Sequence, residues 1–493
     1  MSVEHFDVLV LGAGLSGIGA AYHLQKNCPK KSYALLEARE DLGGTWDLFR
    51  YPGIRSDSDM FTLGYSFRPW ASEKSIADGA EILQYLRDTA SEFGIDRHIR
   101  YGHRVIRAAW SSEDARWTLD IEVGAERQPV RYSCNFFYLC SGYYSYEAGY
   151  LPDFPGVEKF QGTLVHPQQW PQDLDYSNKR IVVIGSGATA VTLVPTLARK
   201  AAHVIMLQRS PSYVMSLPDN DKIALGLGKY LPQKWVHKIV RGKNVLISMI
   251  MYRLCRHRPA FAKRMLRKGI AGRLPEGYPV DTHFKPSYNP WDQRLCLVPN
   301  GDLFKALRKE TASVVTDRIA NFSADGIRLE SGQTLEADIV VTATGLTLVP
   351  CGGVQFEVDG QPINPGQTFS FKGLMMSGLP NVALCVGYTH ASWTLRADLS
   401  SLYVCRLINS MEQKGYSQCM PVIDDVEMDQ RPLLDMSSGY ILRAVDQFPK
   451  QGKSAPWQQN QNYLHDLLDM KFGSISNRGL KFSSPDKALK RSA

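Results

Sequence analysis

The stretch that decides the fold is Val8-Leu-Val-Leu-Gly-Ala-Gly-Leu-Ser-Gly17, close to the start of the sequence. An apolar strand pattern runs from Asp7 to Leu11, and a helix pattern follows from Ser16 to Gln25. The three glycines between them, Gly12, Gly14 and Gly17, permit a tight turn. They also let backbone amides at the helix N-terminus approach a pyrophosphate. The stretch therefore predicts the βαβ start of a doubly wound dinucleotide-binding fold.

The next strand ends at Glu37, 25 residues after Gly12. At this place a carboxylate accepts hydrogen bonds from both hydroxyls of an unphosphorylated ribose. The first glycine turn is therefore expected to bind a dinucleotide without a 2′-phosphate.

The same pattern returns later, with a strand from Arg180 to Ile184 and the turn Gly185-Ser-Gly-Ala-Thr-Ala190. Gly185 and Gly187 keep their places, and Ala190 replaces the third glycine. The second strand of this unit ends in Gln208 and Arg209, with no carboxylate. A guanidinium pairs with a ribose 2′-phosphate, whereas a carboxylate would repel it. The two turns together predict FAD at the first site and NADPH at the second. The alternative for Arg209 is that it is only a solvated charge at the end of a strand.

These units predict an α/β protein with two doubly wound, Rossmann-like dinucleotide-binding domains and a helical insertion in the second. The expected FAD-binding domain comprises residues 1–145 and 336–493. The expected NADP-binding domain comprises residues 146–219 and 291–335. Helical apolar spacing predicts the insertion at 220–290, and a short basic tail follows Ser483.

The composition of the 493-residue chain, with 44% hydrophobic and 22% charged residues, is typical of a globular protein of two or three domains. Its nine cysteines form no CxxC pair and no cluster with histidines. A zinc site and a flavin disulfide reductase are therefore not expected, and no metal is predicted. Met1 leads directly into the first strand without a signal-peptide pattern, so we expect a cytoplasmic protein.

The net charge of +8 comes from one segment, since Lys222 to Arg273 contains fourteen Lys or Arg and no Asp or Glu. A basic excess confined to one segment does not indicate nucleic-acid binding. Two interpretations stay open for this segment: a solvated charged face, or peripheral association with anionic lipid headgroups. The sequence does not determine the oligomeric state.

A more specific string joins the two nucleotide units: Phe160-x-Gly162-x3-His166-x3-Trp170-Pro171. It resembles the fingerprint of Baeyer–Villiger flavin monooxygenases, and the similarity covers nearly the whole chain. The stretches 43–70, 166–195, 288–304 and 391–399 resemble the ethionamide-activating monooxygenase subgroup. The resemblance implies an enzyme that uses NADPH and O2 to insert one oxygen atom into ketones through a C4a-peroxyflavin. It also implies oxidation of sulfur in thioethers or thioamides.

The resemblance assigns further cofactor contacts, namely Gly44, Thr45 and Trp46 on the FAD side and Ala188, Thr189 and Ser210 on the NADP side. His166 is expected to fix the hinge between the domains. The alternative is a flavin monooxygenase that hydroxylates nitrogen or sulfur and has no Baeyer–Villiger activity. Such enzymes generally lack the tryptophan found here as Trp170.

The resemblance also places a catalytic arginine at Arg294, in Asn289-Pro-Trp-Asp-Gln-Arg294, and its positioning carboxylate at Asp57. A guanidinium stays protonated at physiological pH, so it would hold the negative charge that develops on oxygen. The competing interpretation is that Arg294 pairs with Asp292 at the surface. Gln293 replaces the lysine that cyclic-ketone enzymes place before this arginine, which predicts fewer cations for NADP.

Overall fold

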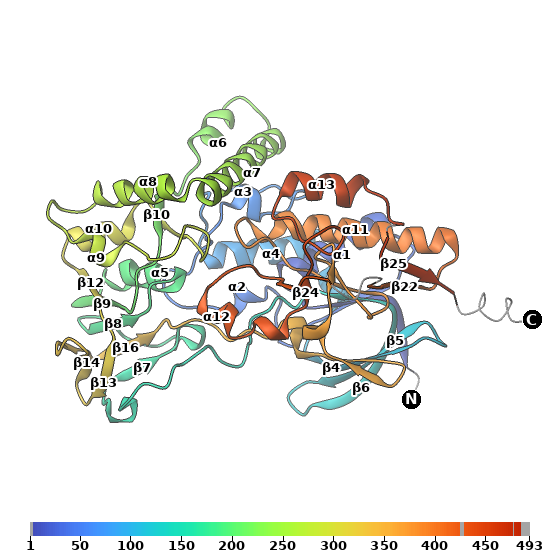
Figure 1. Ribbon diagram of the computed structural model, residues 1–493, viewed down its shortest axis with the longest axis horizontal. Coiled ribbons are helices and arrows are strands. Elements are labelled where there is room, and N and C mark those ends of the chain that lie inside the picture. The colour runs from blue at the N-terminus through green and yellow to red at the C-terminus, as the bar shows by residue number, and fades with distance from the viewer. Residues whose placement is uncertain (1–2, 424–427, 477, 485–493) are drawn as a thin grey trace, which may run out of the picture.

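The computed structural model describes residues 3–423, 428–476 and 478–484. Two α/β domains lie side by side, and a helical projection rises above them (Figure 1). The predicted fold class is confirmed by the parallel strand order of both sheets. Apart from Ser484, the basic tail after Ser483 lies outside the described residues.

The first domain contains the larger sheet. In sheet order its strands are β18 (Gln361–Ile363), β17 (Gln355–Val358), β4 (His103–Ser111), β5 (Arg116–Val123), β6 (Gln128–Leu139), β1 (Glu4–Leu11), β2 (Tyr33–Leu36) and β3 (Ile99–Arg100). β21 (Val382–Leu384) also pairs with the end of β6. Strands β3, β2, β1, β6 and β21 are parallel, whereas β4, β5 and β6 form an antiparallel meander.

β1 is apolar along most of its length because both of its faces are buried. Val8 and Val10 lie in the core between the sheet and three helices, α1 (Leu15–Asn27), α4 (Gly79–Glu92) and α11 (Trp393–Lys414). Leu9 and Leu11 point to the opposite core, where the meander packs. Successive strand side chains alternate between faces, so a continuous apolar run is what a central parallel strand requires.

The second domain contains a five-stranded parallel sheet. Its strands, in order, are β12 (Ala312–Thr316), β9 (His203–Gln208), β8 (Arg180–Ile184), β16 (Ile339–Thr342) and β7 (Thr163–Val165). Two helices, α5 (Ala188–Leu197) and α10 (Asp302–Arg308), cover one face. The small sheet of β13 (Ile319–Ser323), β14 (Gly326–Leu329) and β15 (Thr334–Glu336) covers the other.

One expected boundary is corrected by this sheet. Residues from 336 onward were assigned to the first domain, yet β16 at Ile339–Thr342 pairs with β8 and β7 in the second. Val340 and Val341 are completely buried there. The chain therefore returns to the first domain only after β16.

The helical insertion lies between β10 (Val214–Leu217) and β11 (Cys296–Pro299), which pair in parallel. Its helices are α6 (Lys222–Leu227), α7 (Gln233–His257), α8 (Pro259–Ala271) and α9 (Val280–His283). Figure 1 shows α6 and α7 as the projection above both domains. No helix among the described residues combines the length and apolarity needed to cross a membrane.

α7 belongs in sequence to the second domain but docks on the first. Arg241 donates to the carbonyl oxygens of Phe61, Thr62 and Gly64 at 2.8, 3.1 and 2.8 Å. These carbonyls lie along and just after α3 (Met60–Leu63), where a helix leaves its last acceptors unpaired. A cation is favourable at this negative end of a helix, so Arg241 anchors the insertion.

The remaining elements build the outer part of the first domain. They are α2 (Thr45–Leu48), β19 (Ser370–Phe371), β20 (Met375–Met376), β22 (Gln418–Pro421), β23 (Arg431–Pro432), α12 (Gly439–Leu442), β24 (Lys450–Gln451), α13 (Tyr463–Phe472) and β25 (Leu480–Ser483). A buried ion pair between Arg396 of α11 and Asp466 of α13 ties this layer together. The hydroxyl of Tyr388 also donates to Asp466, at 2.6 Å.

Candidate functional site

The first glycine turn packs so closely that side chains are excluded. Gly12 has a φ of +100°, and a Cβ there would lie 2.8 Å from the carbonyl oxygen of Cys140. A Cβ on Gly17 would lie 1.9 Å from the oxygen of Gly12, and one on Gly44 would lie 3.2 Å from the Cα of Gly14. Gly14 is the N-cap of α1 and supplies no side-chain cap. The first amides of α1 are therefore available to a pyrophosphate, as predicted for an FAD site.

Glu37 stands beside this turn and is 3% exposed. Its carboxylate accepts hydrogen bonds from the amides of Ala13 at 2.8 Å and Arg39 at 3.0 Å. Burial raises the pKa of Glu37, and these two amide bonds oppose that shift. A carboxylate has about four acceptor positions, so two stay available for ribose hydroxyls. The residues present fit the adenosine half of FAD.

The loop after Glu37 is held by the buried carboxylate of Asp47, which pairs with Arg39 at 2.6 Å and Arg50 at 3.0 Å. This fixes Thr45 and Trp46 in α2, directly after Gly44. Trp46 is half-buried and packs against the core beneath α1. The predicted FAD contacts on either side of the first turn therefore lie together.

The second turn offers a more open helix N-terminus. Gly185 has a φ of +138°, and a Cβ there would lie 2.4 Å from the oxygen of Ala343. Gly187 is the N-cap of α5 without a side-chain cap, and nothing lies within 4 Å of the position of its missing Cβ. Ala188 and Thr189 form the first turn of α5. The geometry fits a second pyrophosphate.

The end of β9 lies beside this turn, since the hydroxyl of Ser186 donates to the carbonyl of Ser210 at 3.0 Å. Arg209 is exposed and forms no ion pair or hydrogen bond with the described residues. Gln208 points inward instead and donates to the carbonyl of His283 and the hydroxyl of Thr316, each at 2.8 Å. The guanidinium of Arg209 therefore has no partner among the described residues and is available to a ligand at the second turn.

Arg294 and Asp57 meet at the seam between the two domains, with 3.2 Å between Nε and Oδ2. Asp57 follows a segment that is fixed on both sides. Arg55 pairs with Asp302 of α10 at 2.6 Å. A Cβ on Gly53 would lie 2.2 Å from the hydroxyl of Thr196 in α5. The first domain therefore presents Asp57 to an arginine of the second.

The guanidinium of Arg294 lies among tyrosines of the first-domain side, Tyr143, Tyr144 and Tyr440. Burial opposes its charge, yet the proximity of Asp57 and these rings holds the pKa of Arg294 above its ordinary value. Its side chain is still 38% exposed, so it remains reachable from the seam. Tyr143 also contacts Trp393 edge-on, with 5.3 Å between ring centroids. Trp393 in turn donates to the hydroxyl of Ser16 in α1, at 2.7 Å.

Asp292 does not pair with Arg294. It pairs with Arg256 of α7 at 2.8 Å, and its carbonyl accepts from the amide of Ser437 at 2.8 Å. Trp291, with a φ of +72°, lies edge-on to Tyr252 of α7. The loop that carries Arg294 is therefore held from both the insertion and the first domain.

His166 lies in the segment that joins the domains. Its Nδ1 accepts from the amide of Gln168 at 3.2 Å, and its Nε2 is 3.3 Å from the carbonyl oxygen of Gly345. Its ring covers Gly149 so closely that a Cβ there would lie 1.8 Å away. Burial lowers the pKa of His166. These contacts involve both interdomain segments, and the hinge role stays a prediction.

The sequence reasoning missed the tyrosines around Arg294. Tyr143 and Tyr144 follow Ser141-Gly142 at the end of β6, and this carboxyl edge of the sheet was a signal for them. Tyr440 on α12 carried no such signal, because its place depends on packing of a distant segment.

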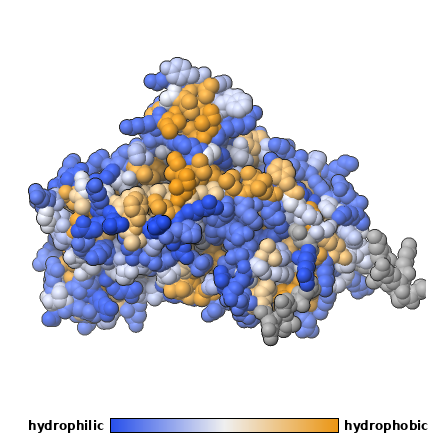
Figure 2. Space-filling model, turned by 45° about the horizontal axis from the view of Figure 1, so that its top comes forward, coloured by the Kyte–Doolittle hydropathy of each residue, from blue (hydrophilic) through white to orange (hydrophobic). Residues whose placement is uncertain are grey.

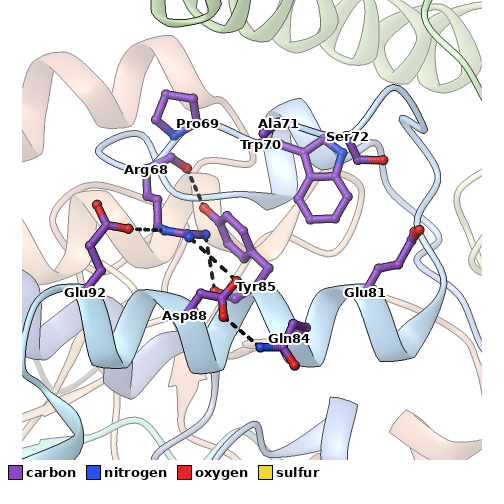
Figure 3. Close-up of a pocket in the computed structure, with 10 residues that line it drawn as sticks. All are labelled: Arg68, Pro69, Trp70, Ala71, Ser72, Glu81, Gln84, Tyr85, Asp88 and Glu92. Atoms are coloured by element: carbon purple, nitrogen blue, oxygen red, sulfur yellow. Dashed lines mark hydrogen bonds and ion pairs between the residues drawn. The ribbon is translucent and has the colours of Figure 1, made fainter.

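An open pocket lies elsewhere on the first domain, between residues 68–72 and α4 (Figure 3). Arg68 pairs there with Glu92 at 2.6 Å and lies over the ring of Tyr85, 4.8 Å from its centroid. None of the lining residues belongs to a glycine turn or to the Arg294 loop. Among the described residues, no group of three or more His, Cys, Asp or Glu could hold a metal ion.

Two glycine turns, one beside Glu37 and one beside Arg209, together with an arginine–aspartate pair at the seam, are the arrangement expected for a flavin-dependent oxygenase. A family model described as flavin-binding monooxygenase-like matches residues 66–223, and one described as an NAD(P)-binding Rossmann-like domain matches residues 10–72. The chain belongs to the flavin-binding monooxygenase family, because a FAD-containing monooxygenase is 54% identical to it over 97% of its length. The predicted enzyme class is thereby confirmed.

The FAD-containing monooxygenase EthA of Mycobacterium tuberculosis (strain CDC 1551 / Oshkosh) is 54% identical over 97% of this chain and 98% of that protein. The putative FAD-containing monooxygenase MymA of the same strain is 51% identical over 98% of each chain. The solved structure of an oxidized steroid monooxygenase bound to NADP superposes with a TM-score of 0.78, covering 97% of this chain and 100% of that one. At 20% identity, that likeness concerns the fold. The family resemblance predicted from the fingerprint is confirmed.

Proposed function

We propose that the chain binds FAD at the Gly12 turn and NADPH at the Gly185 turn, and inserts one oxygen atom from O2 into ketones to give esters or lactones. We propose that it also oxidises sulfur in thioethers or thioamides. The names of its relatives include FAD, and NADP is bound in the steroid monooxygenase structure. When bound and reduced by NADPH, FAD supplies the activation of O2.

The observation that carries the proposal is the ion pair between Arg294 and Asp57. Oxygen insertion at a carbonyl carbon requires an anionic oxygen nucleophile and generates negative charge on the carbonyl oxygen. A permanently charged guanidinium beside the reacting atoms stabilises both charges. Hydroxylation of a soft sulfur needs no such anion, so this arginine favours the ketone reaction.

Asp57 would act as a positioning residue. It approaches Nε, so we expect the two terminal nitrogens of the guanidinium to remain available for the substrate. Tyr143, Tyr144 and Tyr440 lie near Arg294 on the first-domain side, and Trp393 packs edge-on against Tyr143. An aromatic environment lowers the local dielectric, and this strengthens the interaction of Arg294 with developing charge.

The nicotinamide dinucleotide would be selected by Arg209. Its guanidinium has no partner among the described residues and stands one residue after β9, beside the second turn. A 2′-phosphate would therefore form a charge-assisted contact that NADH lacks.

The test is a reaction of the purified yellow protein with NADPH, 18O2 and three substrates: a linear ketone, a cyclic ketone and an alkyl aryl sulfide. The expected products are an ester and a lactone that each gain one 18O atom, and a labelled sulfoxide. A sulfoxide without any ester or lactone across a panel of ketones would contradict Baeyer–Villiger activity and assign the enzyme to heteroatom oxygenation.

A further inference from the structure

An apolar stripe runs along the outer face of α7. Its members Trp235, Ile239, Leu246 and Ile250 are 57%, 45%, 53% and 55% exposed. Their offsets of 4, 11 and 15 residues from Trp235 keep them within about 60° around a helix of 3.6 residues per turn. Four large apolar side chains aligned on one exposed face are unusual for a surface that meets only water.

The stripe continues onto neighbouring elements. Tyr230 and Leu231 precede α7 and are exposed, and so are Leu464, Leu468 and Phe472, which are spaced by four residues on α13. Tyr463 of α13 packs against buried residues of α7, so the two helices are neighbours. Figure 2 shows apolar surface gathered on the projection and continuing below it. We call these residues, from Tyr230 to Ile250 and on α13, the apolar crest.

Unpaired cations lie on the same helical insertion as most of the apolar crest. The segment from Lys222 to Arg273 contains fourteen Lys and Arg residues. Among the described residues, four of them form ion pairs, namely Arg241, Lys243, Arg256 and Arg267. The other ten have no acidic partner among the described residues. Lys238 folds over the ring of Trp235, with 5.0 Å from its ammonium to the ring centroid. Cations thus stand directly beside the apolar side chains.

The inner face of α7 is firmly fixed, so the apolar crest is a rigid platform. Val236, Val240, Val245 and Met249 are buried against the first domain and α6. Arg241 anchors the same face to the α3 carbonyls. α7 presents its outer stripe without unfolding or rearranging.

We propose that the apolar crest docks the protein peripherally on an anionic lipid bilayer. The apolar side chains would enter the boundary between headgroups and acyl chains, while exposed cations next to them, Lys229 and Lys238 among them, contact lipid phosphates. Long Lys and Arg side chains bury their stems along apolar surface and keep their charges at the headgroups. The proposal does not depend on which substrate the enzyme oxidises.

The positive charge of the insertion favours an anionic bilayer over a second copy of the chain as the partner of the apolar crest. Two crests placed face to face would bring the unpaired cations of one insertion, such as Lys229 and Lys238, against those of the other, and like charges repel across a desolvated interface. An anionic bilayer supplies the opposite charge together with an apolar interior. Nucleic acid supplies the charge but offers no apolar layer for Trp235 and Ile250.

The experiment is sedimentation of the holoprotein with vesicles of phosphatidylcholine containing about a third phosphatidylglycerol, against pure phosphatidylcholine. We expect binding to the anionic vesicles only, with a steep decline as salt is raised, since charges are screened within about 10 Å at 0.1 M. The variant Leu246→Ser/Ile250→Ser and the variant Lys229→Glu/Lys238→Glu should each reduce the bound fraction at least tenfold. All four side chains are exposed, so folding should be unaffected.

Matched controls replace exposed residues on the second domain, namely Leu151→Ser for the apolar change and Lys159→Glu/Lys309→Glu for the charge change. They should bind as the parent does. Emission from Trp235 provides a second signal: a blue shift on anionic vesicles that disappears in Trp235→Phe while sedimentation persists. Absence of binding at low salt, or equal binding by crest and control variants, would overturn the proposal. A stable dimer that dissociates in the crest variants would assign the surface to self-association instead.

Discussion

Arg294 of the second domain and Asp57 of the first approach within 3.2 Å, although 237 residues separate them in sequence. The pair couples the first domain to the loop after the helical insertion. Either domain alone would lack one partner, so the charge arrangement exists only when the domains are assembled.

Replacing Arg294 by Ala should separate electron transfer from oxygenation. NADPH oxidation should persist, while ester formation falls by about 10² to 10³, the loss typical of removing one group that stabilises an oxyanion. Electrons should then leave as hydrogen peroxide, which a peroxidase-coupled assay measures. Arg264→Ala, an exposed arginine of α8, is the control. Ester formation at a near-normal rate would mean that the required cation lies elsewhere.

Arg294→Lys should make the reaction sensitive to alkaline pH. Asp57 and the tyrosines hold the pKa of Arg294 above its ordinary value, so the parent stays charged throughout the assay range. A lysine has an ordinary pKa of about 10.4, about two units or more below that of an arginine, so under the same neighbours it loses its charge at a lower pH than arginine does. The ratio of ester to peroxide should stay constant from pH 7 to about 9.5 in the parent and decline in Arg294→Lys. Parallel profiles for the two proteins would contradict the assignment.

Asp57→Asn should give a milder defect than Arg294→Ala, because it removes orientation but keeps the guanidinium charge. We expect a loss of about tenfold in ester formation, in the range of one hydrogen bond to a charged group. FAD content, measured from the flavin absorbance, should be unchanged. A loss as large as that of Arg294→Ala would indicate that Asp57 itself contacts the reacting atoms.

Arg209→Ala should raise the KM for NADPH about tenfold or more, since a contact to a charged phosphate contributes about 1.5–3 kcal/mol. The KM for NADH should not change, because NADH lacks the 2′-phosphate. Arg199→Ala, beyond the far end of α5, provides the matched control. Equal use of NADH and NADPH by the parent would exclude an NADP-selective site.

Breaking the buried pair of Arg396 and Asp466 should destabilise the fold strongly. Asp466→Ala leaves a buried guanidinium without its partner, which typically costs about 3–5 kcal/mol. Glu412→Ala on the same helix α11 breaks an exposed pair with Lys31 and should cost about 1 kcal/mol or less. Urea unfolding of the holoproteins compares the two. Similar costs would show that Arg396 finds another acceptor.

The local parts of the site could be predicted from sequence. The turns at Gly12 and Gly185 and the carboxylate of Glu37 lie within single βαβ units, where spacing along the chain determines geometry. The meeting of Arg294 and Asp57 was expected from family resemblance, because no local rule joins residues so far apart.

The features that the sequence did not predict depend on contacts between segments far apart in the chain. The apolar run at Ile339–Thr342 has the pattern of a buried strand, but only its pairing with β8 and β7 determines to which sheet it belongs. The docking of α7 on the first domain could not be predicted either. Arg241 binds backbone carbonyls, and because every residue has a backbone carbonyl, the sequence does not indicate which ones it binds. Tyr440 reaches the site only through the packing of α12.

The pairing of β21 with β6 has a consequence for synthesis on the ribosome. β6 ends at Leu139, and the strand that covers its edge begins only at Val382. At about 5–20 residues per second, translation of the intervening chain takes roughly 10 to 50 seconds. The second domain, contiguous in sequence, is complete well before that. Ribosome-bound chains that end near residue 375 should therefore resist protease in the second domain and be cleaved in the first. The first domain begins the chain and is the last to close.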